Sequence, residues 1–351
     1  MILVLGLAVM LWAGGLALGV PRSLRLAMVA ALLAGVVLLH LVLPDGHPLR
    51  AATGGSAALW AILAGMAGIV MSYRQGLLWL RRKAETGAEP PAAQAKPGTF
   101  SEAELDRYAR HIVLREIGGP GQKKLKSARV LVIGAGGLGA PALQYLAAAG
   151  VGQIGIIDDD VVDNANLQRQ VIHRDADIGT PKVFSAQAAM QAQNPYVEVR
   201  PYHRRLTAEI AAELFGDYDV ILDGTDNFTT RYLANQAAVR CGRPLISGAL
   251  SQWEGQISVF DPAAGAPCYQ CIFPEAPAEG LAPSCAEAGV IGPLPGVIGA
   301  MMAVEAVKVI TGAGAALRGQ MVIYDALYGE VRRIALDRRA GCPVCDAGAT
   351  G

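Results

Sequence analysis

The stretch that most constrains the fold is VLVIGAGGLGAPALQYLAAAG, residues 130–150. It joins an apolar, largely β-branched run to a glycine-rich turn and then to an Ala/Leu-rich segment that stops at Gly150. This order predicts a strand, a tight turn and a helix that ends on a glycine. The following run, QIGIIDDD, predicts a second strand. A strand–helix–strand unit implies a parallel pair joined by a right-handed crossover, so we expect an α/β sheet.

Later segments extend this sheet. Strand candidates are VEVRPY, DYDVILDG, RPLISGAL, GQISVFD, QMVIYDAL and EVRRIAL, and helical patterns at 181–193 and 228–240 lie between the earlier ones. The last strands follow one another across short gaps, which favours antiparallel pairing. We therefore predict a Rossmann-like, mostly parallel sheet with an antiparallel portion. SEAELDRYARHIVLREIG, in which Ser101 and Glu104 have the capping-box spacing, predicts a helix at the start of this domain.

Residues 1–83 have a different character. Three apolar runs, at about 1–20, 26–43 and 54–73, each approach the ~20 residues that span a bilayer. A secretory signal peptide is disfavoured because no charged segment precedes the first run and two further runs follow it. We predict a membrane region with about three transmembrane helices preceding the α/β domain. Two spans, or buried core helices, are the alternatives.

Charge divides the chain at the same place. Residues 1–83 carry seven basic side chains and one acidic side chain, Asp45, whereas the remainder carries 23 basic and 29 acidic side chains. Arginines follow the first and third runs, so the positive-inside rule places the first loop and everything after residue 74 in the cytoplasm. The acidic balance of the remainder argues against a nucleic-acid-binding surface. We expect a flexible Pro/Ala-rich linker at 84–99 and one large domain at 100–351.

The turn inside the strand–helix–strand unit has the spacing G-x-G-x-x-G. Its glycines are Gly134, Gly136, Gly137 and Gly139. Backbone N–H groups at such a turn approach phosphates closely, and the start of the helix adds positive potential. Asp158 ends the next strand, 19 residues after Gly139, where a carboxylate can accept hydrogen bonds from ribose hydroxyls. The pattern predicts a nucleotide site. A purely structural turn is the alternative, and the turn does not distinguish NAD from ATP.

Basic residues follow the predicted nucleotide turn. NLQRQ puts Asn166 and Arg169 just beyond the second strand, where both could meet phosphates. GTPK predicts a helix with Thr180 as N-cap, so Lys182 projects from a helix start that already favours anions. A solvated surface side chain is the alternative for an arginine in this position.

Two carboxylates follow another predicted strand. LDGTDN places Asp223 and Asp226 at its C-terminal end, the edge at which open α/β sheets bind ligands. A carboxylate there can hold magnesium, although Asp in such a sequence also forms turns and caps. Together with Arg169 and Lys182 these carboxylates suit triphosphate chemistry, and no comparable set suggests hydride transfer.

Four of the six cysteines form two C-x-x-C pairs. The pairs are Cys268 with Cys271 and Cys342 with Cys345. Four thiolates are the ligand set of a closed tetrahedral zinc site, so we predict structural zinc, with tertiary structure bringing the distant pairs together. Disulfides and a redox-active pair are the alternatives, and a cytoplasmic domain disfavours structural disulfides.

The other two cysteines lie outside these pairs. Cys241, in AAVRCGRP at a predicted helix end, is interpreted as a small packing residue. Cys285 lies in a Gly/Pro-containing loop that a partner could reach. From the residues alone, an inert thiol and a reactive one are equally favoured at Cys285. A reactive thiol requires a lowered pKa, which depends on the surroundings of the thiol in the folded chain.

The large domain also resembles a known family. RYARHIVLREIGGPGQKKLKSARVLVIGAGGLG, DGTDNFTTRYLAN, SGALSQWEGQISVFDP, PSCAEAGVIGPLPGVIGA and both cysteine pairs are similar to enzymes that adenylate ubiquitin-like sulfur carriers. Molybdopterin-synthase adenylyltransferases are the nearest group, and thiamine-pathway carrier adenylyltransferases are near relatives. The resemblance covers residues 100–346 and leaves the membrane region outside.

The resemblance implies a reaction and its participants. The family uses ATP and magnesium to adenylate the C-terminal glycine of a small β-grasp carrier protein and releases pyrophosphate. Arg110 would reach the site in trans, from the second protomer of a homodimer. Without the resemblance, Arg110 is interpreted as a surface residue of the first helix. The remaining matches would be Gly137 near ATP, Asp158 on the ribose, Asn166, Arg169 and Lys182 on the phosphates, and Asp226 on magnesium.

Cys285 matches a cysteine that some relatives use for thioester or acyl-disulfide chemistry and others do not require. No C-terminal rhodanese domain is recognised, which implies a separate sulfur donor. We therefore predict a membrane-tethered, cytoplasm-facing adenylyltransferase that acts on the molybdopterin-synthase small subunit in molybdenum cofactor biosynthesis. The alternatives are the thiamine-pathway carrier as substrate, a non-catalytic membrane scaffold that recruits a carrier, and an NAD-dependent oxidoreductase. Arg169 and Lys182 disfavour the last.

Overall fold

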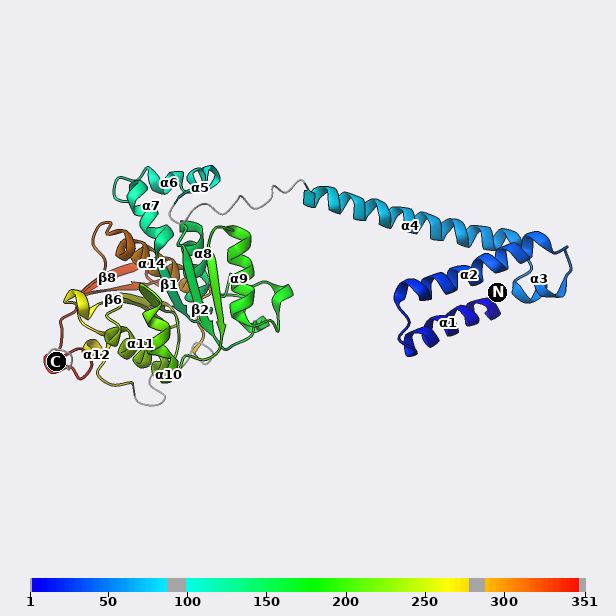
Figure 1. Ribbon diagram of the computed structural model, residues 1–351. Helices are drawn as coiled ribbons and strands as arrows, with labels where there is room; N and C mark the ends of the chain where they lie inside the picture. The colour runs from blue at the N-terminus through cyan, green and yellow to red at the C-terminus, as the bar shows by residue number, and fades with distance from the viewer. Residues whose placement is uncertain (1, 87–98, 278–287, 347–351) are drawn as a thin grey trace. The chain divides into compact units, whose positions relative to one another are not determined.

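The structure of the chain is a computed structural model that describes residues 2–86, 99–277 and 288–346 (Figure 1). The chain forms two compact units, Met1–Ala93 and Gln94–Gly351. Most of the linker predicted at 84–99 lies outside the described residues, and its first three residues continue a helix.

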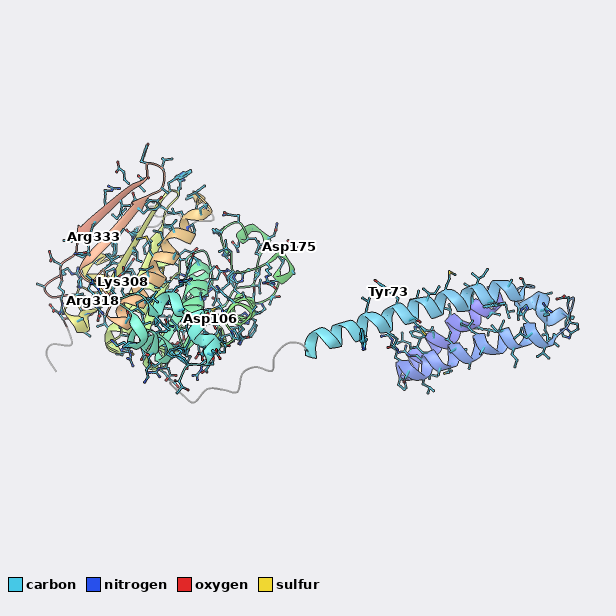
Figure 2. All side chains as sticks on the ribbon, turned by 90° about the horizontal axis from the view of Figure 1, so that it is seen from above. Tyr73, Asp106, Asp175, Lys308, Arg318 and Arg333 are labelled. Carbon is cyan, nitrogen blue, oxygen red and sulfur yellow. The ribbon has the colours of Figure 1, made fainter. Side chains whose placement is uncertain are left out.

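The first unit is helical. Its helices are α1 (Ile2–Ala17), α2 (Arg22–Val42), α3 (Pro48–Thr53) and α4 (Ala57–Thr86). A small core joins Val4, Val36 and Trp60, whereas many large apolar side chains are exposed. Leu41 of α2 is 72% exposed and Tyr73 of α4 is 69% exposed (Figure 2). The helices therefore leave most of their apolar surface unburied within the unit.

Helix length and composition bear on the predicted spans. Among the residues that the structure describes, two helices are long and apolar enough to cross a membrane, α2 and α14 (Pro293–Thr311). Half of the apolar window of α14 is buried inside the second unit, as in the core helix of a globular domain. Helix α1 is apolar but has only 16 residues. The three-span membrane region stays a prediction.

The second unit begins with three short helices, α5 (Glu102–Arg107), α6 (Ala109–Ile112) and α7 (Gly118–Ser127). The predicted capping box is present, because Ser101 Oγ accepts the Glu104 N–H and Glu104 Oε2 accepts the Ser101 N–H. The helix expected to continue from there breaks at Tyr108. The Tyr108 ring fills the space beside Gly150, and its hydroxyl accepts a hydrogen bond from Asn194 Nδ2 at 2.8 Å. Long-range packing overrides the local helical pattern.

One eight-stranded sheet forms the centre of this unit, in the order β3-β2-β1-β4-β5-β6-β7-β8. The strands are β1 (Arg129–Ile133), β2 (Gln153–Asp158), β3 (Glu198–His203), β4 (Val220–Asp223), β5 (Leu245–Leu250), β6 (Glu254–Phe260), β7 (Gln320–Asp325) and β8 (Glu330–Ala335). Strands β1 to β5 pair in parallel, and β6, β7 and β8 join them as antiparallel strands. The predicted Rossmann-like sheet with an antiparallel portion is confirmed.

Helices cover both faces of the sheet (Figure 1). On one face lie α8 (Gly139–Ala149), α9 (Lys182–Gln193) and α14; on the other lie α10 (Ala208–Gly216), α11 (Phe228–Arg240) and the short α12 (Tyr269–Ile272). Val132 of β1 belongs to the first core and Leu131 to the second, as the alternation of a strand requires. Ile133 pairs with Ile157 and Asp223. The carboxyl ends of β1, β2 and β4 therefore meet at one edge.

Candidate active site

A cavity of about 890 Å³ lies at the carboxyl ends of β1, β2 and β4. The predicted residues that line it are Gly134, Gly136, Gly137, Asp158, Arg169, Lys182 and Asp226. These residues come from five separate stretches of the sequence, and the parallel sheet brings them to one place. This is the edge at which open α/β sheets bind ligands.

The glycine turn leaves β1 under tight steric limits. Gly134 has φ +88°, a left-handed conformation that glycine adopts without strain. A Cβ on Gly139 would lie 1.9 Å from the Gly134 carbonyl oxygen, so α8 can begin this close to the strand only with glycine there. Gly136 and Gly137 line the cavity. The turn therefore presents backbone atoms to the cavity, as a phosphate site requires.

Asp158 ends β2 beside this turn. Its Oδ2 accepts a hydrogen bond from the Ala135 N–H at 2.7 Å, and its Oδ1 accepts one from the Asp160 N–H at 2.8 Å. Burial raises the pKa of Asp158, although these two N–H groups and the Lys182 charge oppose the rise. A carboxylate accepts about four hydrogen bonds, so Asp158 can fasten the turn and still accept from ribose hydroxyls.

Arg169 and Lys182 bring positive charge to the cavity wall. Arg169 Nη2 donates to Asn166 Oδ1 at 3.0 Å, and Nη1 donates to the Ala165 carbonyl at 3.3 Å. Lys182 opens α9; its side chain is 5% exposed and its Nζ lies 2.8 Å from Asp160 Oδ2. The described residues that line the cavity do not include Asn166. Its observed contact is with Arg169, which it orients.

The structure separates Asp223 from Asp226, two carboxylates that the residue pattern alone does not distinguish. Asp223 is 1% exposed and accepts hydrogen bonds from the Thr225 N–H, the Thr225 hydroxyl and the Ser247 hydroxyl, with Arg231 Nη1 3.5 Å away. Its acceptor capacity is used inside the protein. Asp226 is exposed and lines the cavity. Asp226 is therefore the carboxylate available to a metal ion.

Arg231 of α11 supports the carboxylate loop, residues 223–227, which carries both carboxylates. Its role was not predicted. It is 5% exposed and donates to Ser247 Oγ at 3.0 Å, to the Gly248 carbonyl at 2.7 Å and to the Thr225 carbonyl. The only local signal in the sequence is that Arg231 shares a helix face with buried alanines three and seven residues later. An arginine on an apolar face indicates a buried polar network.

His173 supports the glycine turn and was also missed. Its Nε2 donates to the Ala135 carbonyl at 2.9 Å, and its Nδ1 lies 2.8 Å from Ser185 Oγ. Burial lowers the pKa of His173, against the opposing effect of the Ala135 hydrogen bond. His173 and Asp158 thus hold the two backbone groups of Ala135 from opposite sides of the turn. No local sequence pattern marks a lone buried histidine.

Two predicted residues lie elsewhere. Arg110 is an exposed residue of α6, and the described residues lining the cavity do not include it. A role for Arg110 would therefore require a second protomer. Cys285 lies outside the described residues, and Cys241 is half-buried with its Sγ 3.4 Å from the Ala212 carbonyl.

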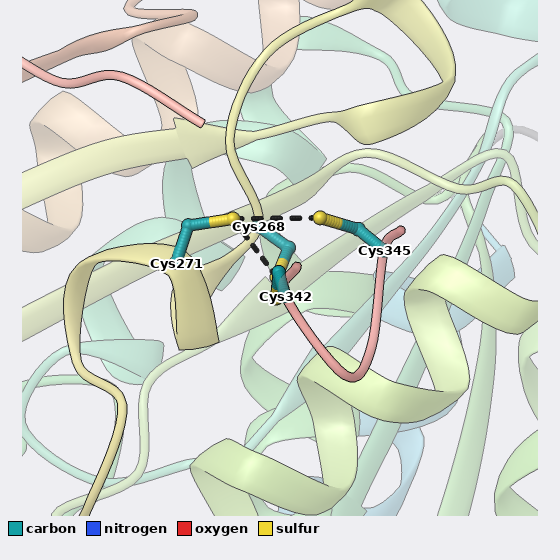
Figure 3. A group of neighbouring side chains, drawn as sticks. All are labelled: Cys268, Cys271, Cys342 and Cys345. Carbon is teal, nitrogen blue, oxygen red and sulfur yellow. Dashed lines mark hydrogen bonds between the residues drawn. The ribbon is translucent and has the colours of Figure 1, made fainter. Parts of the chain in front are cut away.

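The four paired cysteines form a second site, in which their sulfur atoms point toward one another (Figure 3). Cys268 Sγ lies 3.7 Å from the sulfurs of Cys271 and Cys342, and Cys271 Sγ lies 3.4 Å from that of Cys345. A tetrahedral zinc with Zn–S bonds of about 2.3 Å separates its sulfur ligands by about 3.8 Å. A disulfide would need about 2.05 Å. The cluster fits one tetrahedral metal ion.

Electrostatics of the cluster also favour a cation. Burial raises the pKa of Cys268 and of Cys345. Burial alone would raise the pKa of Cys342 too, but hydrogen bonds from the Cys345 and Val344 N–H groups lower it to about 6. Four buried thiols of which one ionises readily make a site that a divalent cation would stabilise by converting the others to thiolates.

The chain is similar to known proteins. The family model for the ThiF family matches residues 108–344. The sulfur carrier protein adenylyltransferase of Thermus thermophilus is 49% identical over 250 residues, covering 70% of this chain and 92% of that protein. The SAMP-activating enzyme E1 of Haloferax volcanii is 48% identical over 250 residues, covering 71% of this chain and 92% of that protein. The adenylyltransferase and sulfurtransferase MOCS3 of Sus scrofa is 46% identical, covering 73% of this chain and 55% of that protein.

Solved structures support the same fold. MccB of E. coli, in a crystal structure with MccA-N7isoASN, matches with a TM-score of 0.61 at 21% identity. The match covers 71% of this chain and 76% of the MccB chain. A crystal structure of PaaA matches with a TM-score of 0.60 at 21% identity, covering 84% of this chain and 91% of the PaaA chain. At this identity the likeness concerns the fold alone.

Proposed function

The chain belongs to the ThiF family, and from that membership we propose that it uses ATP to adenylate the C-terminal glycine of a ubiquitin-like sulfur-carrier protein. Relatives that are 46–49% identical over the aligned residues are adenylyltransferases by name, so the chain is a nucleotidyltransferase of this kind. The observation that carries the proposal is the convergence of the glycine turn, Arg169, Lys182 and Asp226 on one cavity.

The geometry suits attack by one anion on another. The carrier carboxylate forms a new bond to the α-phosphorus while the bond from that phosphorus to the bridging oxygen breaks, and pyrophosphate leaves. Arg169 and Lys182 offset the repulsion between carboxylate and triphosphate, and the backbone of the glycine turn orients the phosphates in line. The carboxylate is already ionised, so no general base is needed.

Asp226 would hold the magnesium ion that accompanies the triphosphate. Its exposed carboxylate, next to the cavity cations, fits the oxygen ligands that this ion prefers. Bound there, the ion would neutralise phosphate charge. Asp158 would accept hydrogen bonds from the ribose while it fastens the turn through Ala135.

The carrier is the finer part of the proposal. The similarity of the domain to molybdopterin-synthase adenylyltransferases favours the molybdopterin-synthase small subunit, with the thiamine-pathway carrier as the second candidate. ATP–pyrophosphate exchange with each purified carrier tests the choice. Exchange with the thiamine carrier alone would overturn it. ATP binding without exchange on any carrier would favour a non-catalytic scaffold.

The cysteine cluster would hold one structural zinc, supported by sulfur–sulfur distances of 3.4–3.7 Å and by burial. Cys285 is the candidate for sulfur or acyl chemistry after adenylation, with sulfur supplied by a separate donor. Replacing Cys285 with Ser should leave exchange intact. It should stop only a later step in which a thiol forms a covalent bond to the carrier.

Arg110 would act in trans within a homodimer. The support is its exposure on α6 and its position outside the cavity of its own chain. Chains carrying Arg110→Ala and chains carrying Asp226→Ala should each lose exchange, and mixing them should restore it, because one site of each mixed dimer keeps both residues. No recovery on mixing would argue against action in trans.

The first unit would tether the enzyme to the membrane with the adenylation domain in the cytoplasm. The outward apolar side chains of the unit and the arginines after the first and third runs support this. Protease treatment of inside-out vesicles should digest the domain. A protected domain would mean the opposite orientation.

A further inference from the structure

Tyr269 lies between two sites that the proposed function treats as independent. It occupies the first x of the Cys268–Cys271 pair and is 4% exposed. Its ring contacts those of Phe273, Phe260 and Tyr232, with centroids 4.8, 5.4 and 5.5 Å away. Tyr269 also lines the reaction cavity. One buried ring is therefore part of the cavity wall and also of residues 268–271, the turn between the first two cysteines, which we call the knuckle.

Asn235 of α11 attaches the knuckle to the helix beside the cavity. Its Oδ1 accepts the Tyr269 N–H at 2.8 Å, and its Nδ2 lies 3.8 Å from Cys268 Sγ, within hydrogen-bond range for sulfur. The side chain is 1% exposed. Asn235 is thus a hydrogen-bond partner of a metal-ligating sulfur, and it shares a helix with the residue that holds the carboxylate loop.

Arg231 completes the connection. It precedes Asn235 by four residues, so both lie on the same face of α11. The Arg231 side chain and the Tyr269 ring both line the reaction cavity. Arg231 also donates to the Thr225 carbonyl and faces Asp223. Asp226 follows Thr225 directly, so the connection runs from Cys268 through Asn235 and one face of α11 to the loop that carries the exposed carboxylate.

We propose that Tyr269 and Asn235 are positioning residues through which the metal-bound cysteine cluster fixes the loop of residues 223–227, and with it Asp226. The inference rests on the proposed function, in which Asp226 holds magnesium. A filled four-thiolate site makes the knuckle rigid. Without the metal, residues 268–271 loosen, Tyr269 and Asn235 lose their fixed positions beside Arg231 on α11, and the loop loses one of its anchors.

Hydrogen exchange on the full-length wild-type protein tests the connection without any mutation. Zinc is first removed with a chelator, and exchange of backbone amides is followed by mass spectrometry. We expect faster exchange at 268–273 and also at 223–228, with α8 unchanged as the internal control. Faster exchange at 268–273 alone would overturn the proposal.

Variants separate the two residues. Tyr269→Leu removes the ring that packs at the cavity wall but keeps the backbone N–H that Asn235 accepts, so we expect unchanged zinc affinity and an about tenfold rise in the magnesium concentration for half-maximal exchange activity. Asn235→Leu should weaken zinc binding by about 10–100-fold and raise the magnesium requirement as well. Gln236→Leu changes the neighbouring, exposed amide of the same helix and should match the wild type.

Each result has a definite meaning. A wild-type magnesium requirement in Tyr269→Leu, or wild-type zinc affinity in Asn235→Leu, would overturn the role of that residue. If either variant does not fold, the hydrogen-exchange experiment on the wild type still decides. Absence of pyrophosphate exchange in the wild type with every carrier would contradict the proposed function. Zinc affinity and amide exchange would still report whether the two sites are coupled.

Discussion

The reaction cavity and the cysteine cluster are two ligand sites built in opposite ways. The cavity keeps an exposed carboxylate, Asp226, beside cations that line its wall. The cluster closes on itself, with Cys268 fully buried and Cys345 only 8% exposed. An open site keeps ligand capacity for a substrate, whereas a closed site uses that capacity within the protein. The first should govern activity directly, whereas the second should govern stability and affect activity only through the loop of residues 223–227.

Asp226→Ala gives the largest expected effect. Removing the exposed carboxylate should lower the rate of ATP–pyrophosphate exchange by about 10²–10³-fold, by analogy with the loss of one fixed charge-stabilising group. The melting temperature should stay within error, because Asp226 is exposed. Asp106→Ala, which removes an exposed carboxylate of α5 (Figure 2), is the control. Near-normal exchange in Asp226→Ala would contradict the proposal that Asp226 binds magnesium.

Cys342→Ser should act first on metal content and stability. Metal content should fall from one zinc per chain to none, and the free energy of unfolding should drop by about 3 kcal/mol or more, since loss of a metal belongs to the small set of changes with large effects. Metal analysis and thermal unfolding measure both. Cys241→Ser, at a cysteine outside the cluster, should keep the zinc and the stability. A stable, metal-free wild-type domain would refute the assignment.

The contrast between the sites also explains what the sequence could predict. Two C-x-x-C pairs identify the cluster because the ligand type and local spacing suffice. Asp158 and Asp226 were predictable because strand ends of a parallel sheet converge. The residue pattern alone did not distinguish Asp223 from Asp226, and only the family resemblance singled out Asp226, because the difference lies in contacts with Ser247 and Arg231 that only the folded chain creates.

The fold shows the same division. Strand periodicity and the glycine turn predicted the sheet and its antiparallel portion, because both are local patterns. The break at Tyr108 was not predictable, since its cause is the contact with Gly150 and Asn194 far along the chain. The place of Tyr269 in the cavity wall was missed for the same reason. Local patterns identify ligands and elements, and tertiary contacts decide which of them act together.

His173 gives the smallest effect, and it concerns the cavity alone. Because burial lowers its pKa in the folded chain below the ordinary 6.5, the unfolded chain binds the proton more tightly. His173 therefore contributes stability that is complete above about pH 6.5 and is lost as the pH falls through the lowered value. Urea unfolding of the wild type should show a loss of about 1 kcal/mol per pH unit in this window.

His173→Gln should flatten that loss, because a glutamine amide can still donate to the Ala135 carbonyl but does not titrate. His203→Gln, at an exposed histidine, should keep the wild-type slope. Cys342→Ser should have a lower free energy of unfolding at every pH but the same change per pH unit as the wild type, since the cluster is a separate source of stability. If Cys342→Ser abolishes the slope instead, the acid sensitivity belongs to the cluster, and the two sites do not divide stability in the way their construction indicates.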